Sequence, residues 1–401
     1  MLARDYHQKI KSLREESRYE EALELAKESL NQYKGMDMLK NDYGWCLYHL
    51  YLKKEPVSLQ EIENFRKALT YIVKNIQTNN IYSPLKLSLM KGLEYSKKVI
   101  FDEETVLAYY EKLGNETLSE EERVIEVEGK TIKQPTEKEK WYMHYSKALY
   151  AASRYEECLS LCDRGLTEYE NFHNQNKEWL IKRKADCMIA LGEVATGMGI
   201  LEEIKQQLNH WSVDSSLGEC YQNQENWEQA SKHFALAAYI GGIEKGKVSL
   251  YKKYAELLAI SNPQMAYYHL MLIKRIREEE GWRIKQSLIE EINKFNQMGF
   301  DLPEGKNLEN KLKNFWYEQM FIGKEALTGT IQSILSKGNA GFICATSGEQ
   351  YYFRFVDFAG PRKLIKQGET VTFYTEKSFD KTKQKESIKA VGIKLLRRSR
   401  A

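Results

Sequence analysis

The stretch that decides the fold runs from residue 217 to 237 and reads Leu-Gly-Glu-Cys-Tyr-Gln-Asn-Gln-Glu-Asn-Trp-Glu-Gln-Ala-Ser-Lys-His-Phe-Ala-Leu-Ala. Apolar and small residues recur three or four positions apart on both sides of the polar turn Gln224-Glu225-Asn226. Because this spacing places them on one face of an α-helix, the stretch predicts two amphipathic helices joined by a short turn.

The pattern resembles the tetratricopeptide repeat, a helical hairpin whose small and large residues at these positions let one helix dock closely against the other. Asp214 stands where the family has a Trp, and no Pro closes the unit. Equivalent turn positions fall at 155, 194, 227 and about 263. Their separation is typical of a family with a period near 34 residues and small insertions.

The same pattern extends toward both ends of the helical part. Residues 18–23 read like residues 154–159, so the opening part, 1–115, is expected to hold irregular helical repeats, with helices at 37–53, 58–76, 84–99 and 102–114. Residues 116–136 predict a small hairpin turning at Gly129 or an exposed loop. Further repeats with a capping helix are expected over 137–300, and a linker helix over 301–324.

Net charge divides the chain at the point where the pattern changes. The whole chain of 401 residues carries a formal charge of +3. The part from Lys324 onward holds fifteen Lys and Arg against seven Asp and Glu, a charge of +8, which leaves −5 on the first 323 residues. Runs rich in aromatic and β-branched residues begin near Leu327 and predict strands.

Composition excludes several classes of protein. Six Pro and 24 Gly with 42% hydrophobic residues exclude collagen-like and disordered chains. No apolar window is long enough to span a membrane, and the first residues lack the apolar core of a signal peptide. A soluble, cytoplasmic protein without membrane contact is expected, and the six Cys, which show no framework spacing, are expected to be reduced.

The strand-rich part carries the most specific signal. Gly329-Thr330-Ile331, Gly341-Phe342-Ile343, Tyr352-Phe353-Arg354-Phe355, Thr370-Val371-Thr372-Phe373 and Ala390-Val391-Gly392-Ile393 fall in an order and spacing that resemble the bacterial cold-shock domain. The resemblance covers residues 325–397, with 398–401 as a basic tail. It implies a five-stranded OB-type barrel that binds single-stranded RNA or DNA.

The resemblance also implies which residues contact nucleic acid. Phe342 and Tyr352 match stacking aromatics, Arg354 replaces a usual His and is suited to stack on a base or bind phosphate, and Phe355 matches a further aromatic position. Phe353 and Phe373 are expected in the core. The basic residues expected to attract phosphates are Lys337, Lys363, Lys381, Lys383 and Lys385.

Three departures weaken this match. Ser333, Ile334 and Ala340 stand where the family has aromatic residues. Each lost stack removes roughly 1–3 kcal/mol of binding free energy. An alternative therefore stands beside nucleic-acid binding: a protein-only scaffold or signalling regulator whose barrel mediates assembly.

Catalytic and metal-binding motifs are weak. The loop at 241–248 approaches a phosphate-binding motif, but Val248 occupies the place of the Ser or Thr that holds magnesium. Cys158 and Cys162 have no second pair of metal ligands in the sequence, and the seven His show no ligand spacing. No cofactor, no metal and no enzymatic activity are expected.

Together these features predict a multidomain, all-α superhelical solenoid of tetratricopeptide type followed by a small β-barrel, acting as an adaptor. The solenoid would bind a protein or peptide in its groove or self-associate. The basic side chains proposed for the groove are Lys182, Arg183, Lys252 and Lys253. The architecture suggests a bacterial conflict, defence or mobile-element system.

Overall fold

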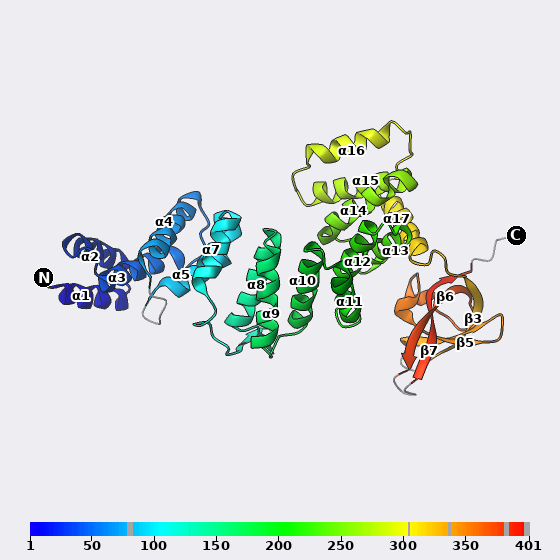
Figure 1. The fold of residues 1–401 in the computed structure, drawn as a ribbon, viewed down its shortest axis with the longest axis horizontal. Coiled ribbons are helices and arrows are strands. Elements are labelled where there is room, and N and C mark those ends of the chain that lie inside the picture. The colour runs from blue at the N-terminus through cyan, green and yellow to red at the C-terminus, as the bar shows by residue number, and fades with distance from the viewer. Residues whose placement is uncertain (78–82, 128, 304, 336–337, 381–384, 397–401) are drawn as a thin grey trace. The chain divides into compact units, whose positions relative to one another are not determined.

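The computed structural model describes residues 1–77, 83–127, 129–303, 305–335, 338–380 and 385–396 (Figure 1). The chain divides into two compact units, Met1–Leu208 and Asn209–Ala401. The first unit is almost wholly helical, and the second begins with helices and ends in a closed five-stranded β-barrel. The predicted fold class, a helical solenoid followed by a small barrel, is confirmed.

The elements of the first unit follow one another in antiparallel helical pairs interrupted once by a hairpin. They are α1 Ala3–Glu15, α2 Tyr19–Gln32, α3 Asp37–Leu47, the π-helix η1 Tyr48–Leu52, α4 Leu59–Asn75, α5 Leu85–Glu94, α6 Ser96–Val99, α7 Glu103–Leu113, β1 Arg123–Val127, β2 Lys130–Gln134, α8 Glu137–Ala151, α9 Tyr155–Glu168, α10 Asn176–Ala190 and α11 Val194–Ile204.

The second unit continues with helices before the strands begin. Its elements are α12 Trp211–Asn223, α13 Trp227–Tyr239, η2 Lys245–Lys247, α14 Val248–Ser261, α15 Pro263–Glu279, α16 Gln286–Asn296, α17 Lys306–Met320, β3 Leu327–Ile334, β4 Ala340–Ala345, β5 Gln350–Arg354, η3 Phe355–Asp357, η4 Arg362–Leu364, β6 Thr370–Asp380 and β7 Lys385–Leu395.

One turn geometry recurs between paired helices. Ser17, Ser153, Gly192 and Glu225 each adopt a positive φ, and each lies two residues before the second helix of its pair. The next backbone N–H donates to the carbonyl five residues back at 2.8 to 3.0 Å. This is the hydrogen bond that closes a helix C-terminus in the Schellman motif. The repeats therefore share a backbone signature that their sequences show only in part.

The pair α14 and α15 uses a different turn. Asn262 separates the two helices, and its side chain accepts a hydrogen bond from the backbone N–H of Met265 at 3.2 Å. Pro263 then occupies the first turn of α15, where its missing N–H costs no helical hydrogen bond. The pair predicted from the turn near 263 is present, but it is joined by an Asn cap.

Close contacts at glycine hold the helical pairs together. A Cβ atom at Gly218 would lie 2.7 Å from Cδ1 of Phe234, and one at Gly165 would lie 2.9 Å from Cδ1 of Tyr142. Because such distances are too short for carbon atoms, the helices approach this closely only where a side chain is absent. The small and large positions of residues 217–237 thus meet across the α12–α13 pair.

The interruption between α7 and α8 is a two-stranded antiparallel hairpin. Strands β1 and β2 pair from Arg123 opposite Gln134 to Val127 opposite Lys130. Gly129, with a φ of 73°, lies in the connection. The structure thus contains the hairpin and not the exposed loop.

Helix α17 lies within the range 301–324 predicted for a linker helix, and it packs into the helical core. Leu308, Leu312, Phe315 and Trp316 form its buried stripe and belong to the same apolar core as α13, α14 and α15. The prediction of a linker over 301–324 missed this packing because the charged residues of α17 alternate with its apolar ones, and only the tertiary structure shows what the apolar face contacts.

A fully buried histidine joins α15 to α17. The Nδ1–H of His269 donates to the Met265 carbonyl at 2.7 Å, and Trp316 donates its Nε1–H to Nε2 of His269 at 2.8 Å. This arrangement requires a neutral imidazole. Burial lowers the pKa of His269 to about 4.

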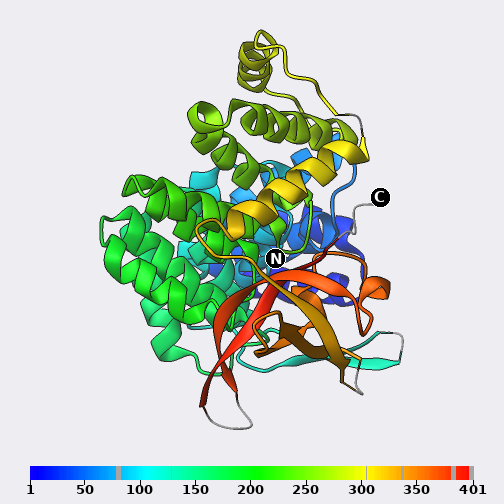
Figure 2. The same cartoon turned by 90° about the vertical axis from the view of Figure 1, so that its right-hand side faces the viewer.

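The barrel closes in the order β3-β4-β5-β7-β6, with one parallel pair, β5 and β7. Side chains that point inward, among them Ile331, Ile343, Phe353, Phe373 and Ile393, form its core. The two Phe residues predicted for the core are both fully buried. Figure 2 shows the β6–β7 hairpin extending from the barrel.

The barrel is fixed to the end of α17 by aromatic contacts. The rings of Phe321 and Tyr374 stack with centroids 4.3 Å apart, and the Tyr317 hydroxyl donates to the Gly392 carbonyl. A Cβ atom at Gly392 would lie 2.4 Å from Phe321, and this residue also has a φ of 57°. Gly392 therefore allows Phe321 to pack directly on the barrel backbone.

We predict that the stability of the α15–α17 packing falls with acidification because of His269. The unfolded state binds a proton near pH 6.5 and the folded state near pH 4, so the unfolded state binds more protons between these values, and stability is lost as pH falls through that window. The free energy of unfolding should decrease by about 2 kcal/mol between pH 7.5 and pH 5 through this residue.

Urea unfolding followed by circular dichroism at both pH values measures this effect. His269→Gln retains a donor and an acceptor but does not titrate, and should lose that part of the pH dependence. Equal pH dependence in the wild type and the variant would contradict the assignment.

Candidate nucleic-acid interface

A row of residues crosses the outer face of the barrel. The strand registers place Ser333 opposite Phe342, Phe342 opposite Tyr352, Tyr352 opposite Lys389, and Lys389 opposite Glu376. We call these five residues the barrel row. Because side chains alternate between the two faces of a strand, Phe342 and Tyr352 point away from the core that Ile343 and Phe353 fill. The structure thus brings together the two aromatic residues predicted to stack on bases.

The two rings form an edge-to-face pair. Their centroids lie 5.8 Å apart and their planes are inclined by 68°. Tyr352 is 38% exposed and Phe342 is partly buried. Unpaired bases stack on aromatic rings that reach the outer face of adjacent strands.

Lys389 is the site residue that sequence reasoning missed. It lies beside Tyr352 only because β5 and β7 pair in parallel across the closed barrel. Its ammonium forms an ion pair with Glu376 at 3.3 Å. Residues 352 and 389 are too far apart in sequence to give a local signal of their contact. Alternation beside the buried Ala390 could have indicated only that Lys389 faces outward.

Arg354 is exposed but has an acidic partner. Its guanidinium donates to both carboxylate oxygens of Asp357, at 3.1 and 3.2 Å. This hydrogen bonding raises the pKa of Arg354. The planar group is thereby held in a fixed position at the end of β5, and any phosphate that binds it competes with Asp357.

Phe355 contributes to the barrel core. Its ring stacks on the buried Phe353 with centroids 6.0 Å apart and planes 15° from parallel. It is only partly buried and packs against the core cluster of the barrel. The structure therefore places it apart from the outward row of Phe342 and Tyr352.

The basic residues predicted around the aromatics are distributed over connections. Lys363 is exposed in the short helical turn η4, and Lys385 begins β7. Lys337, Lys381 and Lys383 lie outside the described residues.

The three departures from the cold-shock pattern occupy distinct environments. Ala340 is buried opposite Arg354, Ser333 is partly buried beside Phe342, and Ile334 is 37% exposed. None of the three offers an aromatic surface. The stacking surface of the barrel row therefore consists of Phe342 and Tyr352.

The four basic side chains predicted for the groove all have intramolecular partners. Lys182 is buried and pairs with Asp186 at 2.6 Å, while Arg183 donates to Ser146 Oγ at 2.7 Å. Lys252 lies between two carboxylates, those of Glu256 and Glu291, and Lys253 pairs with Glu219 at 2.5 Å. These groups stabilise helix packing and do not form a set of free charges.

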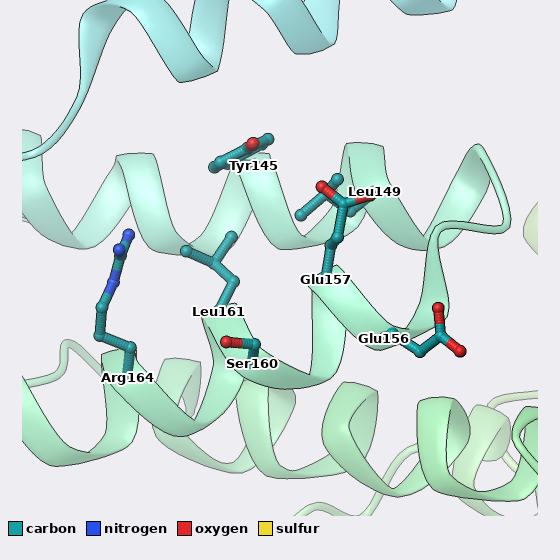
Figure 3. Close-up of a pocket in the computed structure, with 7 residues that line it drawn as sticks. All are labelled: Tyr145, Leu149, Glu156, Glu157, Ser160, Leu161 and Arg164. Carbon is teal, nitrogen blue, oxygen red and sulfur yellow. The ribbon is translucent and has the colours of Figure 1, made fainter.

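A cavity of about 380 Å³, lined by both charged and apolar side chains, lies on α8 and α9 of the first unit (Figure 3). Arg164 lies at one end, Glu156 and Glu157 lie toward the other, and Leu161 lies between them. The Arg164 guanidinium is 5.5 Å from the Trp141 ring, without a carboxylate within ion-pair distance among the described residues. Sequence reasoning did not find this site, because its charges are distributed over two turns of an ordinary repeat helix.

The loop that approaches a phosphate-binding motif has a structural role. The Lys247 ammonium is buried and donates to the carbonyls of Ala238, Ile240 and Gly242, with the last at 2.7 Å. These carbonyls lie at the C-terminal end of α13, where a cation is favourable. Burial lowers the pKa of Lys247 to about 8, and its donors are not directed toward a ligand.

Metal and membrane features were also sought in the described part of the chain. Its His, Cys, Asp and Glu residues form no group of three suited to hold a metal ion. Five Cys are buried and Cys344 is partly buried, all as free thiols. None of the described helices has both the length and the apolar character needed to cross a membrane.

Comparisons with known proteins give similarity in fold. The chain matches no protein-family model and no curated protein sequence. A tetratricopeptide repeat protein from Parabacteroides merdae is 11% identical over 73% of this chain and 98% of its own, with a TM-score of 0.39. Tetratricopeptide repeat proteins are thus among the solved structures that this chain resembles.

Two further structures resemble this chain to a similar degree. The apo form of RapI is 14% identical over 79% of this chain and 86% of its own, with a TM-score of 0.41. The C-terminal part of a repeat protein from Cytophaga hutchinsonii is 11% identical over 79% of this chain and 94% of its own, with a TM-score of 0.29. At these identities and TM-scores the likeness supports no statement about what this chain does.

We predict that Glu376→Gln strengthens binding of single-stranded oligonucleotides at low salt. The substitution frees the Lys389 ammonium, whose surface ion pair is worth up to about 1 kcal/mol, so affinity should rise about two- to fivefold. Fluorescence anisotropy of a labelled oligonucleotide measures it.

The matched control is Glu386→Gln, which removes the same charge from an exposed position on the same hairpin. An equal rise in affinity in both variants would show that only net charge affects binding and would contradict a contact between Lys389 and the oligonucleotide.

Proposed function

We propose that this protein is a non-enzymatic adaptor whose barrel binds single-stranded RNA or DNA and whose helical region binds a protein partner. The observation that carries the proposal is the barrel row, in which the exposed ring of Tyr352 and the partly buried ring of Phe342 lie beside a lysine. Stacking of bases on the rings stabilises the complex, and the surrounding basic residues attract the phosphates of the nucleic-acid strand. The cold-shock resemblance of residues 325–397 supports the same assignment.

The geometry of the barrel row suggests how a nucleic-acid strand would bind to it. One base stacks on Tyr352 and a neighbouring base on Phe342, while Lys389 and Arg354 lie close enough in the strand register to contact the backbone. Both cations have carboxylate partners, Glu376 and Asp357. Binding therefore exchanges ion pairs for phosphate contacts, and salt should weaken it with a slope that reports the number of phosphates contacted.

We predict that Phe342→Ala combined with Tyr352→Ala weakens oligonucleotide binding by the full-length protein at least about 30-fold. Two stacks at roughly 1 kcal/mol or more each account for that loss. Anisotropy titrations with labelled RNA and DNA strands at several salt concentrations measure it.

The control is Tyr150→Ala in α8, a residue 36% exposed that also makes an edge-to-face contact, with Tyr155 at 5.4 Å. It should leave affinity within about twofold. Unchanged binding by the double variant would overturn the stacking proposal, and parallel loss in the control would indicate a general effect on the protein.

The rival function is a protein-only scaffold. The loss of aromatics at Ser333 and Ala340 favours it, and so does the exposure of the apolar side chains of Val356 and Ile388 on the barrel. Purified full-length protein with a raised ratio of absorbance at 260 and 280 nm, reversed by nuclease, would count against this rival. A protein assembly that survives nuclease treatment and the double substitution would support it.

The adaptor half of the proposal rests on the cavity of α8 and α9 in Figure 3. Arg164 is positioned over the rings of Trp141 and Tyr142, whereas Arg154 already neutralises Glu157 through a hydrogen bond of 2.6 Å. A partner that presents a carboxylate to Arg164 and an apolar side chain to Leu161 fits this arrangement.

We predict that Arg164→Glu abolishes recovery of the partner by the tagged full-length protein after nuclease treatment. The substitution places a carboxylate at residue 164 against the carboxylate proposed for the partner, and the two groups repel each other. Quantitative mass spectrometry of the recovered proteins measures it. Lys177→Glu, an exposed substitution of the same charge at the start of α10, should retain the partner. Retention by both variants would exclude Arg164 from the partner surface.

A further inference from the structure

A cavity of about 690 Å³ lies within the second unit, between the end of α13, one face of α17 and the barrel. Asn310, Lys313, Asn314 and Tyr317 follow one another at helical spacing along α17 and line one wall. Lys394 of β7 and Tyr239 of α13 also line the cavity. The barrel row contributes none of these residues.

Lys394 is the unusual group in this cavity. Its Nζ lies 3.5 Å from the centroid of the Tyr317 ring, and burial lowers the pKa of the ammonium. No carboxylate of the described residues lies within ion-pair distance of it, although Glu318 on α17 acts on it at longer range. An ammonium removed from water without a paired anion is unfavourable, and the ring compensates in part.

The other polar groups of the cavity are also hydrogen-bond donors. Lys313 makes only a loose ion pair with Glu309, at 3.7 Å. Asn310 and Asn314 are exposed, and neither side chain has a hydrogen-bond partner among the described residues. No carboxylate lines the described walls of the cavity. The cavity therefore combines two ammonium groups and two carboxamides with a wall of tyrosine.

We propose that this cavity binds a phosphate group, carried either by a free nucleotide or by a nucleic-acid strand. Two ammonium groups and two carboxamides that line one cavity match the several acceptor oxygens of a phosphate, and Glu309, which pairs with Lys313 at 3.7 Å, does not line it. The rings of Tyr239 and Tyr317, with centroids 6.3 Å apart, offer apolar surface to the rest of the ligand. The site is independent of the stacking proposed for Phe342 and Tyr352.

The test uses the full-length protein and three probes: a fluorescent N-methylanthraniloyl derivative of ATP, inorganic phosphate as its competitor, and a labelled single-stranded oligonucleotide. Lys394→Met keeps the aliphatic stem over Tyr317 and removes the charge. The substitution should weaken the binding of at least one of the two fluorescent probes about tenfold or more. Loss for the ATP derivative identifies a free nucleotide, and loss for the oligonucleotide alone identifies a strand phosphate.

The matched control is Lys324→Met. Lys324 is likewise half-buried, lies over an aromatic ring next to α17, that of Phe321 at 5.8 Å, and has a pKa lowered by burial, but does not line the cavity. Binding of both probes should stay within about twofold of the wild type. Asn314→Asp changes an exposed position and leaves the barrel untouched, so it serves as a second variant and should also weaken binding.

The proposal is overturned if Lys394→Met and Asn314→Asp both leave the two fluorescent probes bound as in the wild type. It is overturned equally if the wild type binds neither probe, or if Lys324→Met causes the same loss as Lys394→Met. Displacement of the bound ATP derivative by inorganic phosphate supports recognition of the phosphate itself. Failure of a phosphate excess to displace it would show that the base alone is bound, and would also overturn the proposal.

Discussion

The structure depends on close approach at positions that lack a side chain. Gly218 receives the ring of Phe234 between paired helices, Gly341 receives Phe353 inside the barrel, and Gly392 receives Phe321 where the barrel meets α17. In each case a Cβ atom would lie within 3 Å of an aromatic carbon. Dispersion attraction falls steeply with separation, so these contacts give a large apolar ring the close packing that a side chain would prevent.

Much of the architecture could be predicted from local pattern. Helical periodicity over 217–237 and the change to aromatic and β-branched residues near Leu327 were enough to predict a solenoid followed by a barrel, because each signal repeats within a few residues. The role of α17 was missed for the opposite reason. Its apolar stripe, which runs from Leu308 to Trp316, can be assigned a partner only once α13, α14 and α15 are folded against it.

The candidate sites show the same division. Phe342 and Tyr352 were found through the resemblance to the cold-shock domain, and the register of β4 and β5 places them opposite each other. Lys389 and Lys394 were not found from the sequence, because the residues that they contact, Tyr352 and Tyr317, are distant from them along the chain. Net charge was similarly incomplete: the positive total after residue 323 does not reveal that Lys389 and Arg354 have carboxylate partners.

The contact at Gly392 also concerns how a bound strand would be presented. A barrel joined to helices by a free linker reorients on its own, and a ligand on it samples many directions. With Phe321 seated on the Gly392 backbone and stacked on Tyr374, the barrel is expected to tumble as one body with α17. A strand lying across Phe342 and Tyr352 would then inherit a defined polarity relative to the α13–α17 helices, so that its two ends leave the protein in directions set by the fold.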